Sequence, residues 1–294
     1  MDEFRESLLI IITTPIYILV IGSEILFSHL RRKHLYSTKG VIANVYLSAL
    51  NFSLDILLRG FCLLVLNYFY GFHFFAIENA MLYWVILAIA EDFMFYWLHR
   101  IDHFCRFFWA VHVTHHSSEE YNLTVGFRSS VFQPLYRFIY FIPISLMGFE
   151  GKDIMFMYAA TQIYGILVHT QTVKKLGVFE YLLVTPSHHR VHHASNVKYL
   201  DKNMGMFLII WDKMFGTFQK EEDNEPVKFG LTTNINTYHP LKMVFHEWAN
   251  IIRDITKSSS LKNKFMYVFG PPGWSHDGST KTSTQLQSEL IKHK

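Results

Sequence analysis

The sequence has little cysteine and little net charge, and these two scarcities exclude several classes of protein. The 294 residues include only Cys62 and Cys105, which are too few and too differently placed for a disulfide framework. The formal net charge is +3, and the basic residues are scattered, so nothing indicates a nucleic-acid partner. The sequence shows no internal repeat and no phosphate-loop, dinucleotide, haem or flavin motif, so any oxidative reaction would take its electrons from an external reductant.

Apolar residues are abundant instead. Half of the residues are hydrophobic and 17% are aromatic, which is high for a water-soluble enzyme and typical of a multipass membrane protein. A helix that crosses the hydrocarbon core of a bilayer needs roughly 20 apolar residues. Segments that approach this length are 8–30, 41–75, 80–98, 131–149 and 154–168. We therefore predict an all-α, multipass transmembrane helical bundle.

The charges beside these segments predict their orientation. Basic residues Arg31, Arg32 and Lys33 follow the first segment, which places residues 31–39 in the cytoplasm. Asp55 and Arg59 lie four residues apart in the second segment, where they either neutralise each other or mark a break. One long tilted span over 41–75 brings the later histidine-rich motifs to the cytoplasmic face, whereas a double pass around Gly60 does not. The sequence leaves both arrangements open, in a bacterial inner membrane or the endoplasmic reticulum.

Three regions are expected along the chain. Residues 1–78 hold the N-terminal transmembrane segments, and residues 79–250 hold the catalytic domain with a helical cytoplasmic cap. Residues 251–294 form a C-terminal segment. From Pro271 onward the sequence is rich in Ser, Thr, Gly, Lys and Gln without an apolar pattern, which predicts a mobile tail.

Histidine is concentrated in the middle of the chain. Ten of the seventeen histidines fall between residues 99 and 193, mainly in the motifs HRIDH (99–103), HVTHH (112–116) and HHRVHH (188–193). Offsets of three and four residues place side chains on one face of a helix, and imidazole is a common ligand of iron, zinc and copper. A lone histidine is more often an ordinary core or surface residue. Three matched clusters and His169 supply more donors than one ion uses, so the pattern predicts a two-metal site.

These motifs carry a resemblance to a known family. With EDFMFYW before the first motif and WDKMFGTF after the last, residues 80–218 resemble the fatty acid hydroxylase and sterol desaturase superfamily of membrane di-iron oxygenases. HHSSEEYN, TPSHHRVHH, YLDKNMG and GPPGW are most similar to the branch of alkylglycerol monooxygenases and their bacterial relatives. The sequence is shorter than the animal members of that branch, and it is expected to lack their further C-terminal spans.

The resemblance implies an enzyme that inserts oxygen into a lipid C–H bond. It implies two iron ions, O2 as co-substrate, tetrahydrobiopterin as reductant and, in the glyceryl ether version, cleavage to an aldehyde and glycerol. The implied ligands are His99, His103, His112, His115, His116, His169, His189, His192 and His193. An all-nitrogen site with open positions suits non-haem iron, although the spacing itself does not choose between iron and redox-inert zinc.

Two other functions were weighed. A lipid or sterol desaturase or hydroxylase uses the same site. A histidine-rich metal transporter is a different class, but it should carry ligands near the middle of opposed spans, whereas these histidines follow the spans.

Other polar residues are expected to support the metals, because ligating histidines commonly donate their second N–H to a carboxylate or carbonyl. Asp92, Glu119 and Asn122 are the candidate catalytic or supporting residues, with Asp201, Asp212 and Asn203 as further candidates. His188 lies about 100° around a helix from His189, which predicts a place beside the site rather than a ligand. His239 and His246 are expected in the cap, and no role is expected for His29, His34, His73, His276 and His293.

Overall fold

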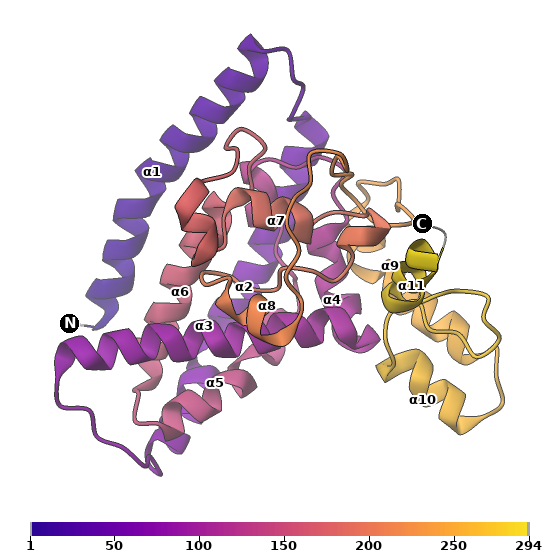
Figure 1. Ribbon diagram of the computed structural model, residues 1–294. Helices are drawn as coiled ribbons and strands as arrows, with labels where there is room; N and C mark the ends of the chain where they lie inside the picture. Colours follow the sequence, from indigo (N-terminus) through magenta and orange to yellow (C-terminus); the bar gives the residue numbers. More distant parts are fainter. Residues whose placement is uncertain (1, 293–294) are drawn as a thin grey trace.

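The computed structural model describes residues 2–292, and its regular structure is helical, as predicted (Figure 1). Within these residues, β pairing is limited to the isolated bridges Leu183–Leu208 and Ala194–Phe229. The α-helices are α1 (Asp2–Leu30), α2 (Thr38–Tyr70), α3 (Ala80–Phe104), α4 (Arg106–His116), α5 (Arg137–Leu146), α6 (Gly151–Leu167), α7 (Pro186–His192), α8 (Ile210–Phe215), α9 (Pro240–Ile255), α10 (Leu261–Phe269) and α11 (Ser283–Lys292). Short 3₁₀ helices are η1 (Leu123–Phe127), η2 (Gln133–Leu135), η3 (Gly177–Tyr181) and η4 (Val197–Tyr199).

Three helices are long and apolar enough to cross a membrane. They are Ile11–Leu30 of α1, α2 and α3. Helix α2 begins at Ser37, whose side chain accepts a hydrogen bond from the backbone N–H of Gly40, and it continues unbroken past Gly60. Its 33 residues correspond to about 50 Å, well over the roughly 30 Å of a bilayer core. The second apolar segment is therefore one long helix, and the double pass around Gly60 is wrong.

The predicted span over residues 131–149 is also wrong. The structure divides this segment into η2 and the ten-residue α5, which is only about 15 Å long. Polar residues hold the segment inside the protein: Gln133 hydrogen-bonds to Asp102 of α3, and Arg137 pairs with Asp55 of α2. The hairpin with α6 nevertheless returns the chain to His169, which directly follows α6 and its C-cap residue.

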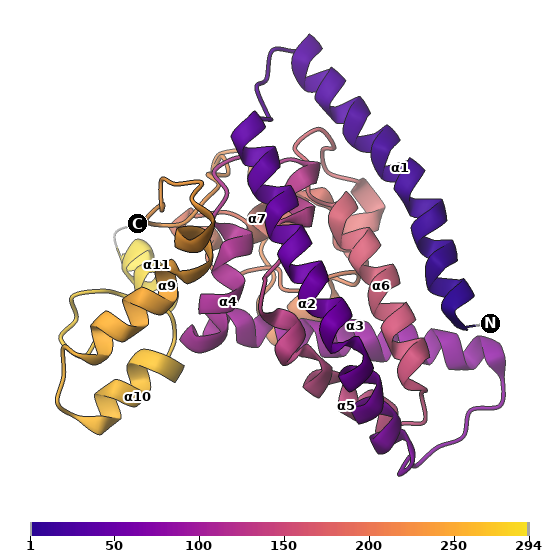
Figure 2. The same ribbon diagram turned by 180° about the vertical axis from the view of Figure 1, so that it is seen from behind.

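Helix α3 runs crosswise to α1, α2 and α6, as Figures 1 and 2 both show. Its N-terminal half packs with α5 and α6 around a buried core that includes Leu87, Phe95 and Phe141. The chain turns at Cys105, which has extended backbone angles, and α4 then packs back on α3. This turn brings the first two histidine motifs against each other.

The C-terminal segment differs from the predicted mobile tail, because residues 283–292 form α11. Gln287 of this helix donates hydrogen bonds to the carbonyls of Val197 and Leu200, at 3.2 and 2.8 Å. Ser283 hydrogen-bonds to Asp201. Polar contacts hold the helix against the protein. Its sequence therefore lacks the apolar periodicity from which a packed helix is predicted.

Candidate metal centre

Four segments bring nine histidines into one buried cluster. The C-terminal part of α3 provides two, α4 provides three, the turn after α6 provides His169, and α7 with its C-cap provides three. Their ring nitrogens form two groups, in each of which the donor atoms lie within 4.8 Å of one another. Group one is His99, His103, His112, His116 and His192, and group two is His115, His169, His189 and His193. All but His115 are buried, and these are the nine residues that the sequence motifs singled out.

The outer nitrogens of the rings are tied to the main chain. Nδ1 of His99 lies 2.8 Å from the carbonyl oxygen of Met204, and Nδ1 of His192 lies 3.0 Å from that of Lys202. The same contact joins His115 to the carbonyl of Arg128 and His169 to that of Gly165, at 2.7 and 2.6 Å. A carbonyl oxygen only accepts, so each of these Nδ1 atoms carries the hydrogen. In a neutral ring the lone pair then lies on Nε2, which points into the cluster.

The inner nitrogens of two of these rings face each other without a hydrogen atom to share. Nε2 of His115 lies 3.3 Å from Nε2 of His169, and both atoms carry lone pairs in the neutral rings fixed above. The buried Nε2 atoms of His103 and His192 have no hydrogen-bond partner among the residues that the structure describes. Converging lone pairs and orphaned inner nitrogens are unfavourable alone. A cation between them satisfies both, so the donor set fits two metal ions.

Burial also keeps the rings neutral. It lowers the pKa of His115 to about 4, and it holds the pKa of His169 and His193 well below the ordinary value. Desolvation, which disfavours the charged form, is the largest cause for all three. Neutral imidazole is the form that binds metals, so the site is ready for ions without first losing protons.

Two carboxylates lie beside group one. Asp201 accepts a hydrogen bond from Nδ1 of His103 at 3.1 Å, as expected for a supporting acid. Asp102 lies 3.8 Å from Nδ1 of His112, whose closer partner is the Ser130 hydroxyl at 2.9 Å. Asp102 was not predicted from the sequence, where an acid between the two histidines of HRIDH was the available signal, and the structure buries it fully.

The three candidate catalytic residues lie elsewhere. Asp92 is buried, and it accepts hydrogen bonds from the backbone N–H groups of Phe207 and Leu208 and from the Trp211 indole, so it fixes a loop. Asn122 caps η1 and donates to the carbonyl of Leu35 at 2.6 Å. Glu119 is exposed. Among the residues that the structure describes, none of the three forms a hydrogen bond with a histidine of either group. Asp92 and Asn122 bind neighbouring loops instead, and Glu119 faces solvent.

Two further candidates act on the loops near the cluster. Asp212 accepts from the backbone N–H groups of Met204 and Gly205, at 2.6 and 2.8 Å, and so holds the segment whose carbonyl contacts His99. Asn203 joins the carbonyls of His188 and Gln219. Both are one step removed from the metal groups.

The remaining histidines stand outside both groups. Helix α7 starts at Pro186 with Thr185 as its N-cap, and His188 serves this start, since its Nδ1 accepts from the Thr185 N–H at 3.3 Å. His246 hydrogen-bonds to the Met243 carbonyl, and His276 to the Tyr267 hydroxyl. His29, His34, His73 and His239 are exposed, and His293 lies outside the described residues.

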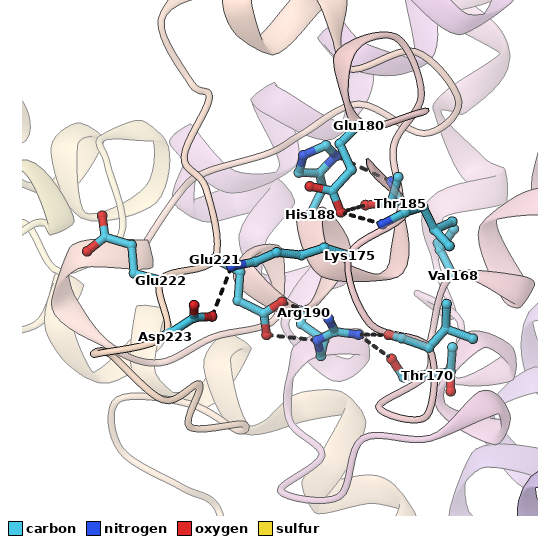
Figure 3. Close-up of polar contacts among 12 residues, drawn as sticks. Val168, Thr170, Lys175, Glu180, Thr185, His188, Arg190, Glu221, Glu222 and Asp223 are labelled. Carbon is cyan, nitrogen blue, oxygen red and sulfur yellow. Dashed lines mark hydrogen bonds and ion pairs between the residues drawn. The ribbon is translucent and has the colours of Figure 1, made fainter. Parts of the chain in front are cut away.

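A buried arginine inside the last motif clamps group two (Figure 3). Arg190 makes a two-pronged ion pair with Glu221, with N–O distances of 2.9 and 2.7 Å. Its third nitrogen donates to the carbonyls of Thr170 and Val173 at 2.9 and 2.7 Å. Arg190 therefore ties α7 to the turn that carries His169. This role was not predicted from the sequence, where Arg190 was assigned no function.

The cluster is reached by cavities from two directions. A cavity of about 460 Å³ is lined by α1, α2 and α6 and touches both groups, through His99 and His112 and through His115, His169 and His189. A larger cavity of about 870 Å³ lies on the cap side, where α9 forms part of its wall, and touches only group one. Each cavity therefore borders a different set of the histidines.

The loops around the centre also contact the end of the first long helix. Glu24 of α1 accepts hydrogen bonds from the Leu123 backbone and the Thr170 hydroxyl. Glu120 accepts from the backbone N–H of Ser37 at 3.0 Å. The basic loop after α1 therefore lies beside the loop that follows the second histidine motif.

Comparison with known proteins finds similarity over this part of the chain. Residues 84–217 match the family model described as fatty acid hydroxylase. The alkylglycerol monooxygenase of Homo sapiens is 42% identical over 208 residues, which cover 70% of this chain and 45% of that protein, and that of Xenopus tropicalis is 38% identical over 210 residues, with the same coverage. An ornithine lipid hydroxylase of Rhizobium tropici is 27% identical over 168 residues, covering 56% of this chain and 51% of that protein. The chain spans less than half the length of the animal relatives, and no solved structure matches it.

Proposed function

We propose that the chain is a membrane-bound di-iron oxygenase acting on a lipid C–H bond, because residues 84–217 match the fatty acid hydroxylase family model and the chain is similar to alkylglycerol monooxygenases. The observation that carries the proposal is the pair of inward-facing histidine groups, which fit two ions and lie beside three helices long and apolar enough to span a bilayer. Iron suits this all-nitrogen donor set, and zinc does not supply redox chemistry.

The residues of the chain hold and shield the ions. Groups one and two would each bind one iron ion through inner nitrogens, while the main-chain carbonyls fix the orientation of four rings. Iron held there would supply the O2 activation that insertion of one oxygen atom into a C–H bond requires. Burial of the histidines excludes water from the centre, which protects a reactive species from side reactions.

We propose a glyceryl ether as substrate, by analogy with the alkylglycerol monooxygenase relatives. Hydroxylation of the carbon next to the ether oxygen gives a hemiacetal, which collapses to a fatty aldehyde and glycerol. O2 supplies one oxygen atom to the product and one to water, and this second atom requires two electrons and two protons. We assign the electrons to tetrahydrobiopterin, an external reductant, with the lipid reaching the centre from the membrane.

The assay is aldehyde release from an alkylglycerol in micelles, with tetrahydrobiopterin present or omitted. We expect aldehyde only in its presence, and no aldehyde from a variant that lacks His115. Activity that ignores the pterin contradicts the choice of reductant. Wild-type protein that holds two irons but releases no aldehyde contradicts the choice of substrate.

A second substrate class is favoured by the more distant relatives. The Rhizobium tropici relative is an ornithine lipid hydroxylase, and a relative in Gibberella zeae is a sterol desaturase with 27% identity over 164 residues. Product analysis of lipid extracts with and without the protein distinguishes these outcomes. Gain of a hydroxylated or desaturated lipid without aldehyde would place the chain with them.

A further inference from the structure

Helix α10 carries an apolar stripe that the described part of the protein leaves largely exposed. Leu261, Phe265 and Phe269 are spaced by four residues, so they lie along one side of the helix. Their exposed fractions are 81%, 61% and 45%, although α10 itself packs against α4 and α9. Single exposed apolar residues are common on proteins, whereas a continuous row of large ones usually marks an interaction surface. The stripe therefore needs a partner.

The stripe is continuous with aromatic rings that lead to the membrane helices. Neighbouring ring centroids lie between 4.8 and 5.7 Å apart in the series Phe265, Phe269, Phe107, Phe108 and Tyr136. Tyr136 directly precedes α5, which packs against the long helices α2 and α3. An apolar path therefore runs from α10, over α4, to the helices that are long enough to cross a bilayer.

The exposed charge beside the stripe has one sign. Lys262 and Lys264 lie on its two sides, because each residue of a helix is turned about 100° from the one before it. Helix α10 contains no acidic residue. The acids of the neighbouring α9, Glu247 and Asp254, both pair with Arg106 of α4, at 2.7 and 2.8 Å. Their negative charge is therefore used inside the protein, and the stripe presents lysines to its surroundings.

We propose that α10 lies in the lipid–water interface of the bilayer that the long helices cross. The apolar stripe enters the boundary between headgroups and acyl chains, and Lys262 and Lys264 contact anionic phosphate groups. A helix with Leu and Phe on one face and lysines beside them is typical of helices that lie in this interface. Lysine suits the position because its apolar stem follows the stripe while its ammonium group reaches the phosphates.

A bilayer is favoured over a protein partner by what surrounds the stripe. Three helices of the chain are long and apolar enough to cross a membrane, and the aromatic path joins the stripe to two of them through α5. Lipid is therefore present beside the stripe without any further association. A protein partner would have to supply both an apolar groove and acidic groups.

The contact attaches the protein to the membrane at a second place. Helices α9 and α10 lie at the end of the molecule opposite the N-terminus of α1, as Figures 1 and 2 both show. Helix α10 packs against α4, which carries three of the histidines. Its position in the interface would therefore hold the histidine-bearing helix at a fixed depth relative to the lipid. This attachment does not depend on which lipid the centre oxidises.

The test measures how deeply single labelled cysteines lie in the bilayer. Full-length, metal-loaded protein is reconstituted into vesicles of phosphatidylcholine and phosphatidylglycerol, and the cysteine carries a fluorophore that nitroxide lipids or aqueous iodide can quench. F265C and L261C place the label on the stripe. The matched control is I291C, because Ile291 is also large, apolar and 75% exposed, but α11 is held by polar contacts. Cys105 is replaced by serine throughout, and Cys62 is buried.

We expect lipid nitroxides to quench the label at position 265 about 2-fold or more, and more strongly from carbon 5 of the acyl chain than from carbon 12, because an interfacial helix lies about 5–10 Å into the boundary. L261C should behave in the same way. The label at position 291 should respond to iodide and not to lipid. Metal content equal to that of the wild type shows that each variant is folded.

Three results overturn the proposal. Iodide quenching at position 265 as strong as that at position 291 would place the stripe in water. Protection from both quenchers would place it against protein, a second copy of the chain included. Equal lipid quenching at both positions would show that the whole cap enters the membrane and that α10 has no special place in it.

The lysines are tested by moving the nitroxide between lipids. In vesicles of one composition, nitroxide on phosphatidylglycerol should quench position 265 about 2-fold more strongly than nitroxide on phosphatidylcholine, because lysines gather anionic lipid. K262Q/K264Q should remove this difference, and K220Q, the same change at an exposed lysine of another loop, should keep it. Equal quenching by both lipids when the lysines are present overturns their assignment. None of these measurements uses turnover, so failure of the proposed oxygenase activity is distinguishable from failure of this attachment.

Discussion

Replacing Arg190 by methionine should release the metal ion that group two binds, while group one keeps its ion. Methionine keeps most of the length of the side chain but removes the ion pair with Glu221 and both hydrogen bonds to the turn after His169. His169 belongs to group two, and α7 contributes His189 and His193 to the same group. Group one takes only His192 from this helix, and its other members come from α3 and α4.

The size of the effect follows from the burial of the pair. The Arg190 side chain is 9% exposed and that of Glu221 is 19% exposed. Removing one partner of a buried pair costs about 3–5 kcal/mol, and the partial exposure of Glu221 reduces this to about 2 kcal/mol. If the whole loss falls on the metal-bound geometry, the affinity of group two drops by roughly 30-fold. R190K keeps the positive charge but lacks the forked guanidinium, so the metal affinity of its group two should lie between those of the wild type and R190M.

The assay is elemental mass spectrometry of protein equilibrated with increasing chelator. R190M should pass from two ions per chain to one at a chelator concentration at which the wild type keeps two. The control is R253M, because Arg253 has a side chain that is 67% exposed and lies on α9, which provides no histidine to either group. The reasoning is refuted if R190M keeps both ions as tightly as the wild type. It is also refuted if both ions leave together, which would indicate general unfolding.

The other predictions are simpler. H115A should lower both metal content and activity by removing a donor from group two, whereas H246A should spare the metal, as elemental analysis will show. Single cysteines at Lys39 and Ser118 should be labelled from the same, cytoplasmic side of sealed vesicles, and opposite accessibility would contradict the predicted orientation. Burial alone would raise the pKa of Asp254, but its contacts with Lys257 and Arg106 outweigh burial and lower it. Its stabilising effect should therefore be complete above its unfolded pKa of about 4 and be lost as the pH falls through the lower folded pKa, and thermal unfolding of D254N should show a weaker dependence on acid.

The sequence predicted which histidines come together because helical spacing controls their placement. Offsets of three and four residues place histidines on one face wherever the segment is helical, and α3, α4 and α7 are helical. The family motifs then identified His169, which has no neighbouring histidine. The single helix over residues 38–70 was one of two arrangements that the apolar pattern allowed.

The features that the sequence did not predict depend on contacts between distant segments. Main-chain carbonyls leave no mark in a sequence, so the partners of the outer nitrogens were not foreseeable. Arg190 and Glu221 are 31 residues apart, and nothing local links them. Asp92 and Asn122 stand near the motifs in sequence, but loop packing uses them elsewhere. Helix α11 is held by polar contacts, so its sequence has no apolar periodicity from which its packing could be predicted.

The tethering of four ligand rings to main-chain carbonyls has an evolutionary consequence. Every amino acid carries that acceptor, so a change of the partly exposed Lys202 side chain leaves its tether in place. Arg128, Met204 and Gly165 are more constrained, because the first two side chains are buried and a Cβ at Gly165 would collide with Met206. The surroundings of the centre can therefore drift in sequence while the geometry of the ligands stays the same. Divergent members of such a lineage would keep the histidines and the course of the backbone, and could vary the neighbouring side chains as their substrates changed.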